Sequence, residues 1–351
     1  RWGCEDPRVT KIGPNKWVIA YTAYSSHGSA VALAITEDFV TATRLGVILS
    51  PPNKDATIFP EQTPDGNWLL LHRPVTGAGE HIWYACSPDM QHWAKPGLLF
   101  PEGQGPWWDA ERIGVGAHFH LSESDGQVRA SLERHGLTPP AYVAELGLLD
   151  LPRPTLLAHC NAAMPEDQAL LAAKGAYVAH TPKTYQKLGM TMPPLPEMLA
   201  RGMYVGLATD GPASNSDFNM LEIMRLTGLY WKGALGDPEV MPRTQLLRMT
   251  AQTSAAAVGF PESGVLAPDR PADLLLLDTT APHWIPRHDL AAGIAYTAHP
   301  ADVVYVWCDG KLLYRQDEFL TLDIERICWE AERRAFRMVG KPMRSLRAYA
   351  A

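Results

Sequence analysis

The sequence lacks long apolar runs, an excess of positive charge and any regular spacing of cysteine. None of its apolar stretches reaches the ~18–20 residues that a membrane-spanning helix needs, so no membrane association is expected. Its 31 Lys and Arg residues are outnumbered by 38 Asp and Glu residues, which gives a formal net charge of −7. A protein with this charge is not expected to bind nucleic acid.

Cysteine and secretion signals are equally sparse. The five cysteines form no CxxC pair, and an odd, unpatterned set is typical of reduced thiols. No basic segment followed by an apolar core marks a secretory signal. A cytoplasmic location is therefore expected. The cysteines are Cys4, Cys86, Cys160, Cys308 and Cys328.

The first 112 residues contain an internal repeat of 51 residues. Trp17 and Trp68 each begin an apolar strand pattern, and Thr36-Glu-Asp-Phe and Ser87-Pro-Asp-Met follow two others. Short strands rich in β-branched and aromatic residues, at a period near 50 residues, are typical of β-propeller blades. About two blades fit here, whereas a closed propeller needs ~4–8, so we predict a propeller fragment.

After about residue 115 the hydrophobic pattern changes to buried strands that alternate with helices. Four apolar strands end at His120, His159, His180 and Asp210, and helical stretches such as Pro165–Lys174 separate them. This alternation predicts βαβ units and a parallel sheet. Polar residues at the carboxyl ends of several parallel strands are typical of a (β/α)8 TIM barrel, of which four strands are half.

The remaining sequence predicts a small antiparallel sheet appended to the half barrel. A helix from about Pro242 leads to Gly259, and segments 264–278 and 302–314 then have strand patterns. The whole chain is thus predicted to be a mixed two-part chain. Its expected parts are a β-propeller fragment over 1–114, strands 5–8 of an α/β TIM barrel over 115–259, and an appended β-sheet with a carboxyl-terminal helix over 260–351.

The polar residues at the strand ends have the chemistry of a metal-dependent hydrolase. Imidazole and carboxylate ligands together suit Zn²⁺ or Fe²⁺, so His120 is predicted to bind a metal and Glu123 to carry a proton. His159 is predicted to hydrogen-bond the attacked centre. Asp210 is predicted to bind the metal and to accept a proton from the attacking water.

Five motifs occur in order over about residues 116–335: HFHLSE, LLAHC, VAHTPKTYQKLGM, GLATDGPASNSDFNMLEIMR and GVLAPDRPADLLLLD. This series resembles the amidohydrolase superfamily, in particular its methylthioadenosine/S-adenosylhomocysteine deaminases and chlorohydrolases. The resemblance implies the roles given above for the four strand-end residues and substrate-binding positions for His118 and His180. It also implies a small-molecule substrate, a heteroaromatic amine such as an adenosine derivative, whose exocyclic group water replaces.

One departure from the family's pattern bears on activity. The family's first strand carries a His-x-His that supplies two more metal ligands, and no such strand precedes His120 here. The His-x-His that the chain does have, beginning at His118, is already the fifth-strand motif. Catalytic zinc sites use at least three protein ligands. We therefore expect zinc or iron to be weakly held and deamination to be impaired.

The first part carries a second series of motifs within residues 1–114: GCEDPR, NKDATIFP, HRP, SPDMQHW and WWDAERIG. These resemble glycoside hydrolase family 130, β-mannoside phosphorylases and related hydrolases on a five-bladed propeller. By this resemblance Asp6 would protonate the leaving oxygen of a β-mannoside through a sugar hydroxyl. Lys54, Arg73 and Arg112 would hold the attacking phosphate, because guanidinium groups pair well with phosphate oxygens.

Three functions remain open from the sequence. The chain is a metal-dependent amidohydrolase, a mannoside-phosphorylase-like sugar-binding propeller, or a non-catalytic chimera of two gene fragments joined near Ile113–Ala117. We favour the amidohydrolase, because that part is the longer one and keeps four site residues. Either fragment would expose unpaired strand edges, which favours homo-oligomers through those edges.

Overall fold

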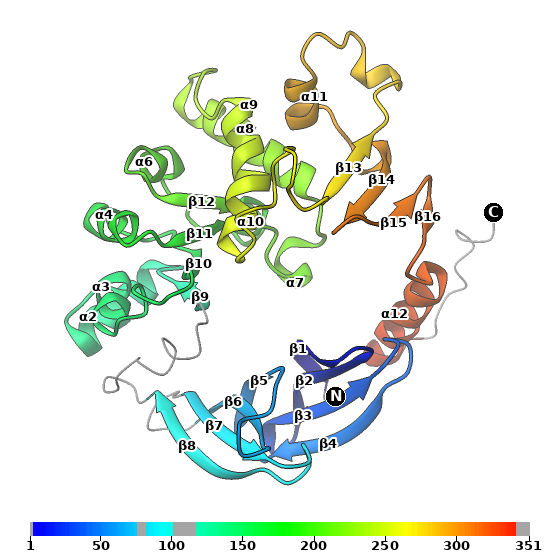
Figure 1. Ribbon diagram of the computed structural model, residues 1–351. Coiled ribbons are helices and arrows are strands. Elements are labelled where there is room, and N and C mark those ends of the chain that lie inside the picture. The colour runs from blue at the N-terminus through cyan, green and yellow to red at the C-terminus, as the bar shows by residue number, and fades with distance from the viewer. Residues whose placement is uncertain (1–2, 76–81, 101–116, 342–351) are drawn as a thin grey trace. The chain divides into compact units, whose positions relative to one another are not determined.

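The computed structural model describes residues 3–75, 82–100 and 117–341 and divides the chain into two compact units (Figure 1). Unit 1 comprises residues 1–105 and 328–351, and unit 2 comprises residues 106–327. Each unit has a buried apolar core of its own.

Unit 1 contains two four-stranded antiparallel sheets, in which each strand pairs with the next along the chain. Alternating apolar residues build the shared core, and Val18, Leu33 and Leu70 are completely buried there. The first sheet consists of β1 (Cys4–Gly13), β2 (Lys16–Ser25), β3 (Gly28–Thr36) and β4 (Thr43–Leu49). The second consists of β5 (Asn53–Ile58), β6 (Trp68–Pro74), β7 (Ile82–Ser87) and β8 (Ala94–Phe100).

The 51-residue sequence repeat corresponds to equivalent positions in these two sheets. Trp17 lies in β2 and Trp68 begins β6, the second strand of each sheet, while Thr36 and Ser87 end the third strands. The turns that follow are built alike. Asp38 accepts hydrogen bonds from the backbone N–H groups two and three residues later, and Asp89 does the same. The repeat is therefore structural, and its interpretation as propeller blades stays a prediction.

Unit 2 is built on a four-stranded parallel sheet with strand order β12-β11-β10-β9. Figure 1 shows α2, α3, α4 and α6 along one side of this sheet and α10 on the other. The side with several helices holds the main core, in which Leu157, Val178 and Val205 are buried. The strands are β9 (His118–Leu121), β10 (Leu156–His159), β11 (Tyr177–His180) and β12 (Tyr204–Leu207).

The helices of unit 2 begin and end at the residues that favour such boundaries. Ser124 caps α2 by accepting a hydrogen bond from the Gln127 N–H, and Gly136 ends it with a left-handed φ of 70°. Pro165 opens α4, as the sequence predicts. The helices are α2 (Asp125–His135), α3 (Pro139–Glu145), α4 (Pro165–Ala173), α5 (Pro182–Leu188), α6 (Leu195–Ala200), α7 (Pro212–Asn215), α8 (Met220–Leu235), α9 (Arg243–Arg248), the π-helix η1 (Met249–Thr253), α10 (Ser254–Ala257) and α11 (Leu290–Tyr296).

The predicted appended sheet is present and antiparallel, with strand order β13-β14-β15-β16. Asp302 ties the connection before β14 together, because its carboxylate accepts hydrogen bonds from the side chains of His283 and Trp284. The elements are β13 (Leu274–Leu277), β14 (Val303–Cys308), β15 (Lys311–Arg315), β16 (Glu318–Phe319), and the short 3₁₀ turns η2 (Pro282–Trp284) and η3 (Pro300–Asp302). The carboxyl-terminal helix α12 (Ile324–Val339) follows, and from Cys328 on it belongs to unit 1.

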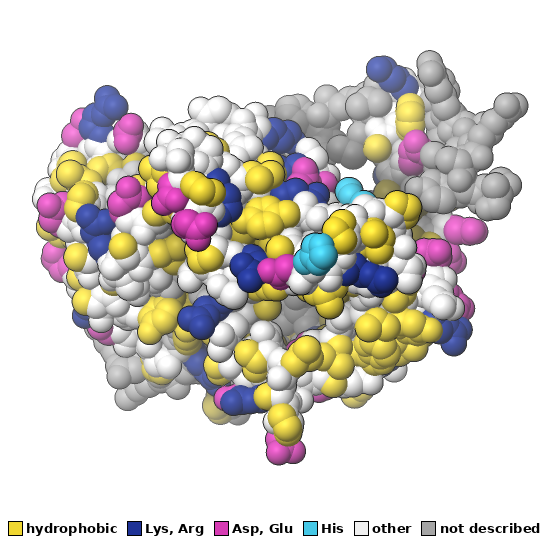
Figure 2. Space-filling view, turned by 90° about the horizontal axis from the view of Figure 1, so that it is seen from above, with side chains coloured by type: hydrophobic (Ala, Val, Ile, Leu, Met, Phe, Trp, Pro, Cys, Tyr) yellow, Lys and Arg dark blue, Asp and Glu magenta, His cyan; other side chains and the backbone are white. Residues whose placement is uncertain are grey.

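The surface carries both signs of charge. On the face that Figure 2 shows, Lys and Arg side chains are interspersed with Asp and Glu side chains. Among the residues that the structure describes, no helix combines the length and the apolarity that crossing a bilayer requires.

Candidate functional site

Polar residues collect at the carboxyl ends of the parallel strands β9 to β12. His159 and His180 are the last residues of β10 and β11, Glu123 lies two residues after β9, and Asp210 lies three residues after β12. His120 is the next-to-last residue of β9. Parallel strands bring these ends to one edge of the sheet, which is where barrel enzymes place their sites.

The chain turns sharply after three of these strands. Ser122, His159 and Asp210 have φ values of 47°, 76° and 64°, a left-handed conformation that is uncommon for residues other than glycine. Backbone strain of this kind concentrates at functional sites. It sets the direction in which the strand-end side chains leave the backbone.

His159 lies at the centre of the candidate site. Its imidazole is buried, with Nε2 3.8 Å from Oε1 of Glu123 and Nδ1 3.2 Å from Oγ1 of Thr181. The ring of His120 lies 5.1 Å away, centroid to centroid. The carboxylate, by contrast, is partly open to solvent, since 38% of the Glu123 side chain is exposed.

The electrostatic surroundings of His159 join the predicted residues into one group. Burial lowers the pKa of His159 below its usual range. Glu123 and Asp210 oppose this shift in pKa, whereas His120 and His118 add to it. All four residues therefore act on the same imidazole, which is kept neutral at neutral pH.

Asp210 is held by the loop that it begins. The backbone N–H of Gly211 donates to Oδ1 over 2.8 Å, and the hydroxyl of Ser214 donates to Oδ2 over 2.7 Å. Two lysines of α5 contact residues further along the chain from Asp210. Lys183 contacts Asp217 and Glu222, and Lys187 donates to the Ser216 hydroxyl over 2.8 Å.

Thr181, Tyr185 and the two lysines were not singled out from the sequence. Tyr185 is completely buried, and its ring meets both histidine rings edge-on, at 5.7 Å for His159 and 5.4 Å for His180. Its hydroxyl accepts a hydrogen bond from the Thr181 N–H. All four residues lie within the motif VAHTPKTYQKLGM, and their place in this motif could have identified them as candidate site residues.

The two histidines predicted to bind substrate have different surroundings. His118 is exposed at the start of β9. His180 is buried, and this burial, with a smaller contribution from His159, lowers the pKa of His180 to about 3. Its Nε2 has no hydrogen-bond partner among the described residues. Substrate contact by either residue stays a prediction.

A second cluster forms in unit 1 around Asp6. Although the residue is exposed overall, loss of water around its carboxyl group raises the pKa of Asp6, and a hydrogen bond and negative charge from Asp55 raise it further. Asp55, which the sequence did not single out, forms an ion pair with Arg73. Lys54 lies beside Arg73 in the β5–β6 ladder. The predicted phosphate ligand Arg112 lies outside the described residues.

Comparison with known proteins identifies the family of the chain. The model of the amidohydrolase family matches residues 34–313, four fifths of the sequence. The chain belongs to the amidohydrolase family. The resemblance predicted from the five motifs is thereby confirmed.

Individual amidohydrolases are similar over part of their length. A 5-methylthioadenosine/S-adenosylhomocysteine deaminase of Moorella thermoacetica is 42% identical over 260 residues, which are 74% of this chain and 59% of that protein. The crystal structure of an adenosine deaminase of Xanthomonas campestris, with bound zinc, aligns with a TM-score of 0.63 and 25% identity over 66% of this chain and 53% of that one. The chain thus spans between half and three fifths of these relatives, and its parallel sheet with flanking helices is a TIM-barrel-like half.

A short likeness exists to a different kind of enzyme. A β-1,2-mannobiose phosphorylase of Listeria innocua is 38% identical over 30% of this chain and 30% of that one, with a TM-score of 0.28. The likeness covers a minor part of either chain, and its TM-score is too low to relate the two folds.

The described residues of this amidohydrolase do not form a complete zinc site. No three or more His, Cys, Asp or Glu side chains in the described ranges are arranged to hold a metal ion. Of the two expected ligands, His120 lies beside His159, and each carboxylate oxygen of Asp210 accepts one hydrogen bond. Catalytic zinc requires three protein ligands and an open position.

Proposed function

We propose that the chain carries half of an amidohydrolase active site for a small heteroaromatic substrate such as an adenosine derivative. In the proposed reaction, water replaces an exocyclic amino group or chlorine on the ring. The convergence of Glu123, His120 and Asp210 on the buried imidazole of His159 carries this proposal. Membership of the family and the deaminase named above support it.

The residues present fit the proton transfers of such a reaction. Glu123, partly exposed, takes a proton from the attacking water and delivers it to the ring nitrogen next to the attacked carbon. The water oxygen forms the new C–O bond, and Asp210 accepts the second proton of that water and passes it to the amino group. The C–N bond then breaks and ammonia leaves. Neutral His159, fixed by Thr181, hydrogen-bonds the attacked centre.

A divalent metal, Zn²⁺ or Fe²⁺, belongs to the proposed site but is expected to be weakly held. The zinc-containing adenosine deaminase supports the type of metal. The incomplete ligand set among the described residues supports the weak affinity. We therefore expect the isolated chain to deaminate substrates at a small fraction of the rate of a complete enzyme.

The test combines metal analysis with a spectroscopic assay. Purified protein is expected to contain substoichiometric zinc, and added Zn²⁺ is expected to produce slow loss of the adenine absorbance band of 5′-methylthioadenosine. Glu123→Gln should abolish this residual rate, because the amide cannot accept the proton. Asp237→Asn, in the exposed connection after α8, is the matched control and should keep the rate.

Two results would contradict parts of the proposal separately. A residual rate that is the same in Glu123→Gln would exclude the assigned site. One tightly held metal per chain together with rapid turnover would show that the site is complete and that the expected impairment is wrong.

The raised pKa of Asp6 supports a second candidate function for unit 1, a phosphorylase acting on β-mannosides. A carboxyl group whose pKa is raised is suited to general-acid catalysis. Among the described residues of this cluster, Lys54 is a cation for phosphate, because Arg73 binds Asp55. Phosphate-dependent release of mannose 1-phosphate that disappears in Asp6→Asn would support this function. Its absence would leave unit 1 without a catalytic assignment.

A further inference from the structure

A cavity of about 390 Å³ lies at the end of the parallel sheet opposite to the candidate active site. Tyr177 and Tyr204, which line it, are the first residues of β11 and β12, whereas His180 and Asp210 lie at and beyond the last residues. Each strand has four residues, and its three intervals of ~3.3 Å place the first residue roughly 10 Å from the last. The cavity is therefore distinct from the proposed amidohydrolase site.

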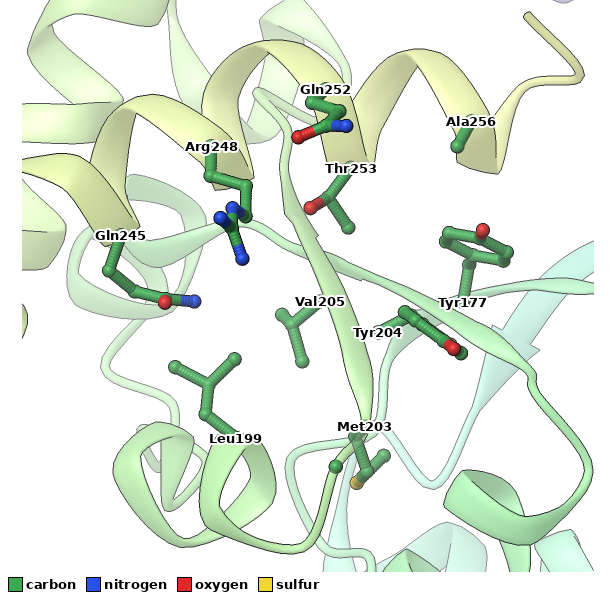
Figure 3. Close-up of a pocket in the computed structure, with 11 residues that line it drawn as sticks. Tyr177, Leu199, Met203, Tyr204, Val205, Gln245, Arg248, Gln252, Thr253 and Ala256 are labelled. Carbon is green, nitrogen blue, oxygen red and sulfur yellow. The ribbon is translucent and has the colours of Figure 1, made fainter. Parts of the chain in front are cut away.

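Helices α9 and η1 provide the polar wall of the cavity. Gln245, Arg248 and Gln252 follow one another at intervals of three and four residues, which places them on one helical face. Figure 3 shows Arg248 and Gln245 directed into the space that they share with Leu199 and Val205. The helix is a π-helix from Met249 to Thr253, a distortion that is frequent at functional sites.

Arg248 supplies the only formal charge among the cavity's lining residues. In the described part of the chain its guanidinium makes no hydrogen bond and no ion pair. Arg243, the first residue of the same helix, behaves differently, since its Nε lies 2.7 Å from the carboxylate of Asp289. The guanidinium of Arg248 is therefore able to pair with a ligand in the cavity, and its positive charge favours an anionic ligand.

Two stacked tyrosines also line the cavity. Their ring centroids lie 5.1 Å apart with an interplanar angle of 24°, and half of Tyr204 is exposed. Partial burial and the neighbouring Tyr204 raise the pKa of Tyr177, so its hydroxyl stays neutral and does not repel an anion. A stacked pair with one accessible ring favours a planar aromatic ligand.

We propose that this cavity binds a small aromatic anion, with the ring on Tyr204 and the carboxylate or phosphate on Arg248. The amides of Gln245 and Gln252 lie on the same wall as the guanidinium and supply hydrogen-bonding groups of both kinds. The volume accommodates a single ring joined to one anionic group, and it falls in the range of small-molecule sites.

Isothermal titration calorimetry on the full chain tests the proposal with matched charged and neutral probes. Uridine 5′-monophosphate represents an aromatic phosphate and 4-hydroxybenzoate an aromatic carboxylate, while uridine and 4-hydroxybenzamide lack the negative charge. At least one anion is expected to bind with a Kd of ~1 mM or lower. Its neutral counterpart should bind about tenfold more weakly or not at all, and the tighter anion identifies the ligand class.

Variants locate the binding in the cavity. Arg248→Gln should weaken the anion by about 10–100-fold and leave the neutral probe unchanged. Arg129→Gln, which removes the same charge from the exposed side of α2, is the matched control and should bind like the unaltered chain. Tyr204→Ala should weaken binding by about fivefold or more, and Tyr204→Phe, which keeps the ring, should restore it.

Other outcomes of these measurements would contradict the proposed binding site. If neither anion binds, or if Arg248→Gln and Arg129→Gln behave alike, the assignment is wrong. Loss of binding in Glu123→Gln, with Arg248→Gln unaffected, would place the ligand in the proposed active site instead.

Discussion

His180 makes the stability of unit 2 depend on pH in a way that can be calculated. The side chain is buried at the end of β11, its pKa is lowered to about 3, and its Nε2 has no partner among the described residues. In the unfolded chain the same imidazole has a pKa of about 6.5. Between these two values the unfolded chain binds a proton that the folded protein does not, so stability falls as pH falls.

The magnitude follows from the unfolded pKa alone, as long as the folded pKa lies well below 5. At pH 7 an unfolded histidine binds about a quarter of a proton, and at pH 5 nearly a whole one. Integrating this difference gives a decrease of about 2 kcal/mol in the free energy of unfolding from pH 7 to pH 5. The effect is small above pH 7 and stops growing only near the folded pKa of about 3.

Urea unfolding at pH 7 and pH 5 measures this decrease. His180→Gln removes the titrating group, so its stability should change by about 2 kcal/mol less than that of the unaltered chain over this interval. The comparison concerns the pH dependence and holds even where the variant is less stable overall. An equal pH dependence in both proteins, or an imidazole that titrates near pH 6.5 in nuclear magnetic resonance spectra of the folded chain, would refute the reasoning.

Three further predictions concern packing, ion pairs and thiols. Leu157→Ala, at a completely buried position, should lower the free energy of unfolding by about 3–5 kcal/mol in urea titrations, while Leu188→Ala, 55% exposed, should change it by less than about 1 kcal/mol. Lys183→Met should lower it by about 1–2 kcal/mol, because Lys183 contacts two carboxylates and is 19% exposed. Lys174→Met removes a contact with one exposed carboxylate, so it should lower the free energy of unfolding by less than Lys183→Met does. Equal decreases in the two variants would contradict this prediction. Cys160 is buried with a pKa raised to about 12, so Cys160→Ser should leave unchanged the number of thiols that react with Ellman's reagent in the native protein; one reactive thiol fewer would contradict this.

The sequence predicted those parts of the fold that local periodicity determines. The 51-residue spacing of Trp17 and Trp68 corresponds to equivalent strands, because a repeated unit places its core aromatic at the same point of each sheet. The helix predicted at Pro165–Lys174 and the strands ending at His159 and His180 were likewise correct. Each of these follows from patterns within one element and its flanking residues.

Contacts between distant segments could not be predicted in the same way. Asp210 lies three residues beyond its strand, and the hydroxyl of Ser214 and the lysines of α5 fix its loop only after folding. The pairing of Asp6 with Asp55 joins strands of two different sheets. The helical face at Arg248 is visible in the sequence, but the Tyr177–Tyr204 stack that lines the same cavity depends on strand register.

The candidate active site separates two tasks that hydrolytic amidohydrolase chemistry combines. Moving a proton requires a carboxylate beside an oriented neutral imidazole, and in our proposal Glu123 and His159 take these two roles. Lowering the pKa of the attacking water requires a metal with at least three protein ligands, which the described residues do not provide. An enzyme with the first capability alone retains positioning and proton transfer but lacks the activated nucleophile. Added zinc should therefore raise the rate of the unaltered chain and have no effect on Glu123→Gln, since the metal and the carboxylate act on the same water.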